Sequence, residues 1–391
     1  MKKLKLITDG SENNEKDTKN NLDFGMLITI IILLCAGIVM VASASSYYAL
    51  SNYNNSNYFL VRQLFFGIIG FIFMIIISNI DYKRYKKWGY LFYIICLVLL
   101  VLVLTPLGQT RNGAKRWLGF GDYLVFQPSE IMKIGLVIGM STYLSLNYKK
   151  LTSFKGYIIP ILMLFLVVIV MFMQKHLSGT IVMFVAACSI IFVSGIKVKA
   201  RYIIAGIIAA AAMLAVFIFM PSGDSTESSG SFRLDRIVSF LNPEEDIKGG
   251  NWQAAQSLYA IGSGGIFGRG LGQSRQKYLW LPEAQNDFIF SVLGEELGLV
   301  GTVTVLALFS FFIYRGYRIA ITARDMYGSL LATGITSAFA LQILVNIAVV
   351  TCTVPVTGMP LPFFSYGGTA LFINLCAMGI LLNISRTCRK N

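Results

Sequence analysis

The chain has 391 residues, of which 55 % are hydrophobic and 13 % are charged, against roughly 25 % charged residues in an ordinary soluble domain. One globular core could not hide so much apolar surface, whereas each helical crossing of a bilayer takes about 20 apolar residues. The composition therefore excludes a soluble protein and predicts a polytopic membrane protein. A net charge of +14 would indicate a nucleic-acid partner only if it lay on one patch, and we expect no nucleic acid to bind.

Ten apolar runs of membrane-spanning length follow a polar N-terminal tail. The tail, residues 1–24, is mixed in charge and is predicted to be disordered, and a second short tail covers residues 386–391. We predict spans at about 25–45, 58–79, 88–105, 128–147, 156–173, 179–196, 203–220, 288–313, 328–350 and 368–385. Residues 25–385 are thus expected to form one all-α membrane domain of about ten transmembrane helices.

Basic residues in the loops predict that both termini lie in the cytoplasm, because the cytoplasmic side carries the excess of lysine and arginine. This orientation places 21 basic residues inside and ten outside. The largest outer loop, residues 221–287 between the seventh and eighth spans, is far longer than a connection requires, and such loops are usually functional or disordered. Its later part alternates aromatic, glycine and charged residues, which indicates an ordered segment.

Asp287 lies where this loop meets the eighth span, next to Phe288. Partial burial there would raise the pKa of its carboxyl toward that of a useful general base. The same position suits an ordinary N-terminal helix cap, for which aspartate is among the best residues, and the spacing alone favours the cap. Glu283, one helical turn earlier, could simply be a solvated surface carboxylate.

Besides Arg62, four charged residues fall inside predicted spans, where an unpartnered charge costs several kcal/mol. Glu295 and Glu296 lie two turns into the eighth span, and Glu130 and Lys133 lie near the outer end of the fourth. The i, i+3 spacing of Glu130 and Lys133 places them on one helix face, where they could neutralise each other. Structural ion pairs explain the four residues at least as well as substrate contacts, and either role places them inside the bundle.

Arginines in the predicted outer loops run against the topology rule and need an explanation. Arg111 and Arg116 lie in one outer loop and Arg233 in another. Arginine suits bidentate binding of phosphate, which indicates a phosphate-bearing substrate at the outer membrane surface. Attraction to anionic lipid head groups explains the same residues, and the composition does not separate the two.

Several motifs, in order along the chain, resemble those of one bacterial family. They are GAKRWL (113–118), FQPSEIMK (126–133), SFLNP (239–243), QSL (256–258), GSGGIFGRGLG (262–272), LPEAQNDFIF (281–290), GEELG (294–298) and LPFFSYGG (361–368). The chain resembles the SEDS family (shape, elongation, division and sporulation proteins) from about residue 25 to its end. VTG (356–358) and LNISR (382–386) are more similar to the division and sporulation branch (FtsW and SpoVE) than to the elongation branch (RodA).

The resemblance implies an inverting peptidoglycan glycosyltransferase that polymerises lipid II on the outer face of the bacterial cytoplasmic membrane, in septal or spore wall synthesis. It implies a class B penicillin-binding protein, a transpeptidase, as partner, together with other divisome or elongation components. The essential acidic residue of the family's PEAxxDFIF motif falls on Asp287, which makes it the expected catalytic base and reverses the preference for a cap. The remaining substrate-binding candidates are Arg116, Arg233, Lys133, Glu130, Arg111, Lys277 and Glu283, with Glu295 and Glu296 as structural residues.

No cofactor is certain, although a divalent cation (Mg or Mn) could accompany the diphosphate with ligands that are unknown. The chain departs from the family at QKHLSGT (174–180), where many members have QPDxGT, and at Gln285, where many have histidine. The second departure argues against proton transfer at position 285, and His176 has no assigned role. Two rival functions stay open: a lipid II flippase or transporter, and a non-catalytic scaffold for the penicillin-binding protein.

Overall fold

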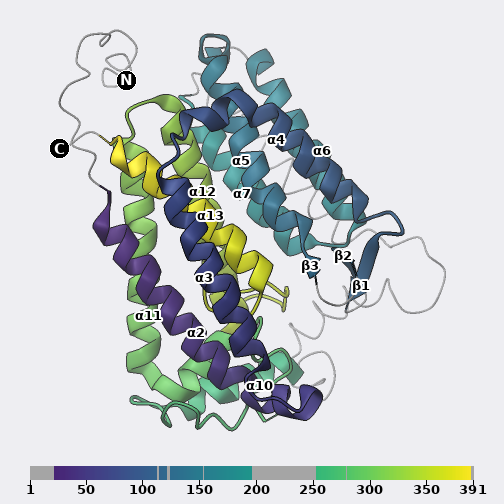
Figure 1. The fold of residues 1–391 in the computed structure, drawn as a ribbon, viewed down its shortest axis with the longest axis vertical. Helices are drawn as coiled ribbons and strands as arrows, with labels where there is room; N and C mark the ends of the chain where they lie inside the picture. Colours follow the sequence, from purple (N-terminus) through teal and green to yellow (C-terminus); the bar gives the residue numbers. More distant parts are fainter. Residues whose placement is uncertain are drawn as a thin grey trace.

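The structure, a computed structural model, describes residues 22–111, 114–120, 124–152, 154–195, 252–278 and 280–388. These residues form ten α-helices, two short 3-10 helices and one small sheet. Seven of the helices are long and apolar enough to cross a membrane. The prediction of a mostly helical, polytopic membrane protein is therefore confirmed (Figure 1).

The first three predicted spans correspond to α2 (Phe24–Tyr53), α3 (Tyr58–Ser78) and α4 (Lys83–Leu102). Asp23 begins α2 as a typical N-cap, because its carboxylate accepts a hydrogen bond from the N–H of Met26 at 2.8 Å. Helix α4 begins five residues before the predicted start at residue 88. Lys83, Arg84, Lys86 and Lys87, which precede the predicted span, therefore belong to the start of the helix.

A three-stranded antiparallel sheet, which the sequence analysis did not predict, connects α4 to the next helix. Its strands are β1 (Gly108–Arg111), β2 (Ala114–Phe120) and β3 (Leu124–Phe126), paired in the order β1-β2-β3. Strands of three to seven residues that carry glycine and basic residues give little of the alternation by which a strand is recognised. The sheet is thus an addition to the predicted helices.

The next three predicted spans correspond to α5 (Pro128–Leu146), α6 (Ile158–Met173) and α7 (Leu177–Val193). The 3-10 helices at Tyr148–Thr152 and Phe154–Tyr157 connect α5 to α6. Nearly every side chain of α5 from Met132 onward is buried, so α5 lies inside the bundle. The seventh predicted span and the first part of the predicted outer loop lie outside the described residues.

The ordered segment expected in the later part of the outer loop is α10 (Trp252–Ser263), and the last three spans correspond to α11 (Ile289–Thr322), α12 (Met326–Val350) and α13 (Gly368–Arg386). Ser257 of α10 is fully buried and donates a hydrogen bond to the carbonyl of Val350 at 2.6 Å. This contact fixes α10 against the outer end of α12.

Helix α11 is interrupted at Gly298, whereas the sequence predicts a continuous span. Gly298 has φ 65° and ψ −161°, a conformation that suits glycine. The carbonyls of Glu295 and Glu296, which the break leaves without helical partners, accept hydrogen bonds of 3.0 Å from the N–H groups of Arg269 and Gly270. A loop that precedes α11 in the sequence therefore completes the hydrogen bonding of the broken helix.

Helices α12 and α13 form the centre of the molecule (Figure 1). Helix α12 packs against α5, α7 and α11, and α13 packs against α3. An aromatic cluster lies at this centre, in which the rings of Phe312 on α11, Phe339 on α12 and Phe363 in the segment before α13 are in mutual contact. The group α4–α7 lies on one side of this centre, and α2, α3 and α11 lie on the other.

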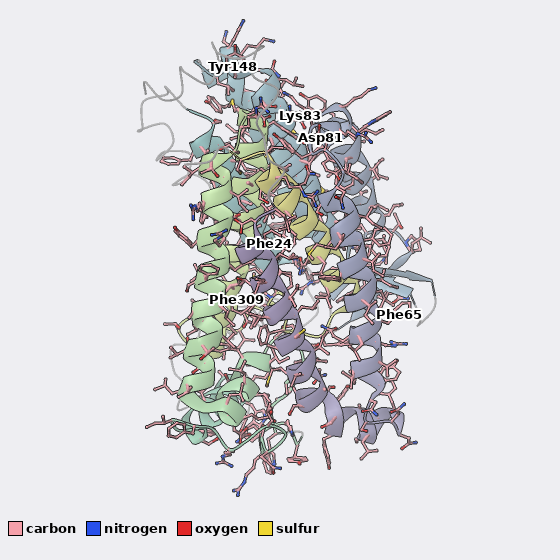
Figure 2. The ribbon with its side chains drawn as sticks, turned by 60° about the vertical axis from the view of Figure 1, so that its left-hand side comes forward. Phe24, Phe65, Asp81, Lys83, Tyr148 and Phe309 are labelled. Atoms are coloured by element: carbon pink, nitrogen blue, oxygen red, sulfur yellow. The ribbon has the colours of Figure 1, made fainter. Side chains whose placement is uncertain are left out.

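The two ends of the described chain meet at one end of the bundle (Figure 1). Asp23 forms an ion pair with Arg315, and its backbone N–H donates to the hydroxyl of Ser385 at 3.1 Å. Arg386 donates to Asn79 at 2.8 Å, and the N–H of Tyr82 donates to Asn383 at 2.8 Å, while Figure 2 shows Asp81, Lys83 and Tyr148 toward one end of the bundle. The segments predicted to be cytoplasmic thus lie together, while the side of the membrane that they face stays a prediction from the charge distribution.

Candidate active site

Asp287 is half-buried at the end of a tight loop that leads into α11. The loop turns at Glu283, whose φ is 56°, and the N–H of Asn286 donates to the Glu283 carbonyl at 2.9 Å. The side-chain amide of Asn286 donates to the Glu283 carboxylate, so Glu283 stabilises the loop. The helix-cap interpretation of Asp287 is wrong, because α11 begins at Ile289 and its cap position is therefore Phe288.

Hydrogen bonds hold the backbone of this loop at three successive carbonyls. The carbonyl of Gln285 accepts from the N–H of Tyr366 at 2.9 Å, and that of Asn286 accepts from the hydroxyl of Ser365 at 2.7 Å. The carbonyl of Asp287 accepts from the amide of Asn346 on α12 at 2.8 Å. The loop is thus fixed through its main chain against α12 and the segment that joins α12 to α13.

Gly358, in the segment between α12 and α13, faces the Asp287 side chain. It has φ 68°, and a β-carbon at this position would lie 3.5 Å from Oδ2 of Asp287. A glycine here combines a left-handed backbone with the absence of a side chain next to the carboxylate. One side of the Asp287 carboxylate therefore faces the backbone of Gly358.

Glu130 and Lys133 form the ion pair that their spacing predicts, with Nζ 2.9 Å from Oε2. Lys133 is 5 % exposed, and its ammonium also donates to Gln342 at 3.0 Å and to Asn374 at 3.5 Å. These three partners use the three donors of an ammonium group. Through Gln342 and Asn374, Lys133 connects α5 to α12 and α13. Gln342 lies one helical turn from Asn346, which donates to the Asp287 carbonyl.

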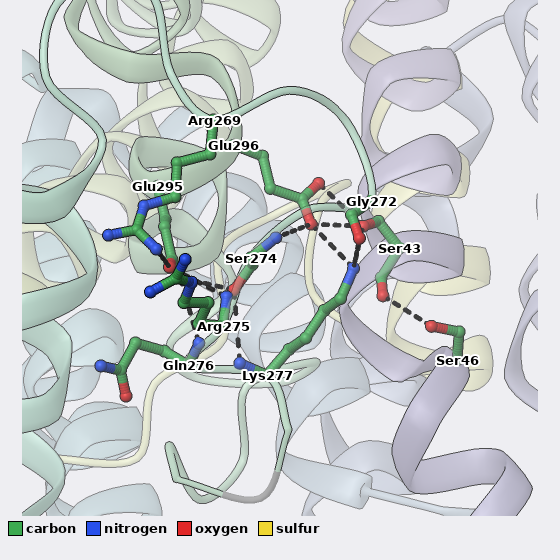
Figure 3. Close-up of polar contacts among 10 residues, drawn as sticks. All are labelled: Ser43, Ser46, Arg269, Gly272, Ser274, Arg275, Gln276, Lys277, Glu295 and Glu296. Atoms are coloured by element: carbon green, nitrogen blue, oxygen red, sulfur yellow. Dashed lines mark hydrogen bonds and ion pairs between the residues drawn. The ribbon is translucent and has the colours of Figure 1, made fainter.

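Glu295 and Glu296 each have several partners in a buried polar cluster (Figure 3). Glu295 accepts from the hydroxyl of Ser274 at 2.5 Å and lies 3.7 Å from Arg269. Glu296 pairs with the buried Lys277 at 3.0 Å. Lys277 also donates to the hydroxyl of Ser43 on α2 at 3.1 Å. Lys277 thus links the outer loop to α2 and α11, away from the Glu130–Lys133 pair.

Arg116 and His176 connect the small sheet to the turn between α6 and α7. Arg116 on β2 donates to the carbonyl of Lys175, and Nε2 of His176 lies 2.8 Å from the side-chain nitrogen of Gln127. Burial, and after it the charge of Arg116, lowers the pKa of His176 to about 3. The ring is therefore neutral near pH 7, so an unprotonated Nε2 accepts from the Gln127 amide.

The structure does not place every predicted site residue. Arg233 lies outside the described residues, and Arg111 is described only as part of the backbone of β1. Within the described part of the chain, no three His, Cys, Asp or Glu side chains lie together as a metal site.

Four buried polar residues that hold either the Asp287 loop or Lys133 were not predicted from the sequence: Asn346 and Ser365 for the loop, and Gln342 and Asn374 for Lys133. Asn346 and Gln342 lie one turn apart in a long apolar helix, and burying an amide is costly unless it is hydrogen-bonded. The signal was therefore a pair of amides at i, i+4 in a membrane span. Charged residues are the stronger signal in a predicted span, because burying a charge in a membrane costs more free energy than burying an amide.

Comparison with known proteins gives consistent matches over nearly the whole chain. The FtsW/RodA/SpoVE family model, described as "Cell cycle protein", matches residues 25–390. Stage V sporulation protein E of Bacillus subtilis (strain 168) is 43 % identical over 95 % of this chain and 99 % of its own length. A probable peptidoglycan glycosyltransferase FtsW of Geobacter sp. (strain M18) is 38 % identical over 94 % of this chain and 97 % of its own length.

Solved structures show the same fold. A chain from a structure entitled "Structural coordination of polymerization and crosslinking by a peptidoglycan synthase complex" has a TM-score of 0.75, with 26 % identity and coverage of 95 % of this chain and 99 % of that chain. The rod shape determining protein RodA of Thermus thermophilus has a TM-score of 0.68, with 26 % identity and coverage of 95 % and 98 %. The chain belongs to the FtsW/RodA/SpoVE family.

Proposed function

We propose that this protein is a peptidoglycan glycosyltransferase that polymerises lipid II on the outer face of the bacterial cytoplasmic membrane. The observation that carries the proposal is the site of Asp287. Its carboxylate is half-buried next to bare backbone, on a loop whose three successive carbonyls are fixed by hydrogen bonds. A general base needs this combination of access to substrate and a fixed position.

In the proposed reaction, Asp287 accepts the proton of the 4-hydroxyl of the acceptor sugar. The hydroxyl oxygen forms a bond to the anomeric carbon of the donor while the bond from that carbon to the diphosphate breaks, so the configuration inverts. Polyprenyl diphosphate leaves with the bonding electron pair, and its developing charge requires cationic stabilisation. We assign this role to Arg116 and Arg233, with Arg111 as a further basic residue of the same loop as Arg116.

The buried ion pairs have a supporting part in this proposal. All three donors of Lys133 have partners within the protein, which leaves none for the substrate. Lys133 and Glu130 therefore shape the inner wall of the site. Lys277 and Glu283 are substrate-binding candidates from the sequence. Lys277 pairs with Glu296 and Glu283 accepts from Asn286, and these contacts favour a role in stabilising the Asp287 loop. A divalent cation, Mg or Mn, would arrive with the diphosphate, whose oxygens and bound water would supply most of its ligands.

We infer that the protein works with a penicillin-binding transpeptidase of class B and with other divisome or elongation components. The relative in a peptidoglycan synthase complex that coordinates polymerization and crosslinking supports a transpeptidase partner. Similarity to Stage V sporulation protein E and to FtsW proteins favours septal or spore wall synthesis over elongation. Depletion of the protein, followed by microscopy of septa and spores, tests this assignment.

The direct test is polymerisation of lipid II by the purified protein together with its transpeptidase. We expect Asp287→Asn, which keeps the side-chain shape, to lower the rate of glycan synthesis by at least about 100-fold, the usual contribution of a general base. Asp81→Asn is the matched control, since Asp81 is exposed at the opposite end of the bundle. Equal rates for the wild type and Asp287→Asn would refute the assignment of the base.

The two rival functions predict different results in the same experiment. A flippase would move lipid II across vesicle membranes and form no glycan strands with either protein. A non-catalytic scaffold would tolerate Asp287→Asn in growing cells, with complex formation intact.

A further inference from the structure

Asn346 is buried in the middle of the site and makes two unusual contacts. It is 1 % exposed, on a helix composed largely of apolar residues. Its side-chain nitrogen donates to the carbonyl of Asp287 at 2.8 Å and to that of Met359 at 2.7 Å. One amide therefore joins two irregular segments, the loop before α11 and the segment between α12 and α13.

These two contacts determine how the amide is turned. Because both N–H groups of Asn346 are used by carbonyls, its oxygen must point the other way, and among the described residues nothing donates to that oxygen. A buried amide with only half of its hydrogen bonds made is costly. The stability of α12 alone therefore does not explain why this position holds an asparagine.

The second segment that Asn346 holds includes the wall of the site. Met359 directly follows Gly358, which faces Oδ2 of Asp287. Asn346 therefore fixes both sides of the space around the carboxylate, namely the main chain that carries Asp287 and the backbone that faces it. Gln342, one turn earlier on α12, donates to the next carbonyl, that of Pro360, at 3.0 Å.

We propose that Asn346 is a positioning residue for Asp287. It keeps the carboxylate at a fixed distance and angle from the acceptor hydroxyl by holding the main chain of the Asp287 loop against the Gly358 segment. The inference rests on the proposed function, in which Asp287 is the general base. A displacement of about 1 Å in such a group can lower a rate by about 100-fold.

The test measures kcat and KM for lipid II with the complex of the protein and its transpeptidase. For Asn346→Ala we expect kcat to fall by about 10-fold to 100-fold, while KM changes by less than about threefold because Asn346 touches Asp287 only through the main chain. Asn346→Asp keeps the shape of the side chain and, at a pH where the new carboxylate is ionised, removes both donors, so kcat should fall similarly there.

A pH profile of Asn346→Asp tests whether position 346 lies close enough to act on Asp287. Asn346→Asp also places a carboxylate near Asp287, and a like charge raises the pKa of a neighbouring carboxyl. The base must be ionised, so the acidic limb of kcat should move to higher pH in Asn346→Asp and stay in place in Asn346→Ala. A loss of folding alone would lower kcat only in proportion to the unfolded fraction, which thermal unfolding of each variant measures.

Asn383 on α13 is the matched control. It is also buried (6 % exposed) and also joins two backbone groups, the N–H of Tyr82 and the carbonyl of Ser78, both at 2.8 Å. It lies at the opposite end of the bundle, so Asn383→Ala should lower the melting temperature about as much as Asn346→Ala and leave kcat within about twofold of the wild type.

Two results would overturn the inference: a kcat within twofold of the wild type for both Asn346 variants, or an equal loss of kcat in Asn383→Ala. If Asn346→Ala does not fold, the kcat of folded Asn346→Asp, compared with that of Asn383→Ala, decides. Full activity of Asp287→Asn, measured alongside, would instead refute the proposed function, so the two failures are distinguishable.

Discussion

The buried Lys277–Glu296 pair allows a quantitative prediction about stability. Glu296 has no exposed surface, and its carboxylate accepts from Lys277 at 3.0 Å, from the hydroxyl of Ser43 at 2.6 Å and from the N–H of Ser274 at 3.3 Å. Lys277→Met would remove the cation and leave two neutral donors for a buried charge. Breaking a buried ion pair in this way costs about 3–5 kcal/mol.

The double variant tests whether the loss comes from the unpaired charge. Glu296→Gln keeps the length of the side chain and removes its charge, so Lys277→Met with Glu296→Gln should lose clearly less stability than the two single variants added together. The measurement is thermal unfolding of the purified protein in detergent, with a double-mutant cycle. A loss below about 1 kcal/mol for Lys277→Met, or strict additivity, would refute the reasoning.

Three further predictions concern single residues. Gly358→Ala should lower polymerisation by about tenfold or more without unfolding the protein, since alanine is strained at φ 68° and relief of that strain would shift a backbone that lies in van der Waals contact with the Asp287 carboxylate; rates and melting temperatures measured together check this. Gly268→Ala should destabilise the protein strongly, because its β-carbon would lie 2.1 Å from the carbonyl oxygen of Glu296 at the break in α11, and thermal unfolding would reveal it. The pKa of His176 is about 3 in the folded protein and about 6.5 in the unfolded chain. Because only the unfolded state binds this proton between these values, the stability present above pH 6.5 should fall by up to about 1.4 kcal/mol per pH unit as the pH drops toward 3. His176→Gln should show a smaller loss in the same titration.

The sequence predicted the features that depend on local pattern. Hydropathy runs predicted nine described helices, and the i, i+3 spacing of Glu130 and Lys133 predicted their ion pair. The partner of Glu296 was not predicted, because Lys277 is 19 residues away in the sequence and only the fold brings them together. The break in α11 was missed for a similar reason: Gly298 shows its role only when Gly268 packs against it.

The segment that carries Asp287 is fixed at both of its ends, and this arrangement links stability to catalysis. Ser274 and Lys277 hold the beginning of the segment on Glu295 and Glu296, through contacts of 2.5 Å and 3.0 Å. Asn346 holds the end of the segment at Asp287 itself. Because both anchors restrain the same stretch of chain, releasing the first should also displace the carboxylate. Lys277→Met should therefore lower kcat as well as stability, and the added Glu296→Gln change should restore part of both, whereas a lysine that bound the diphosphate would leave activity lost in the double variant.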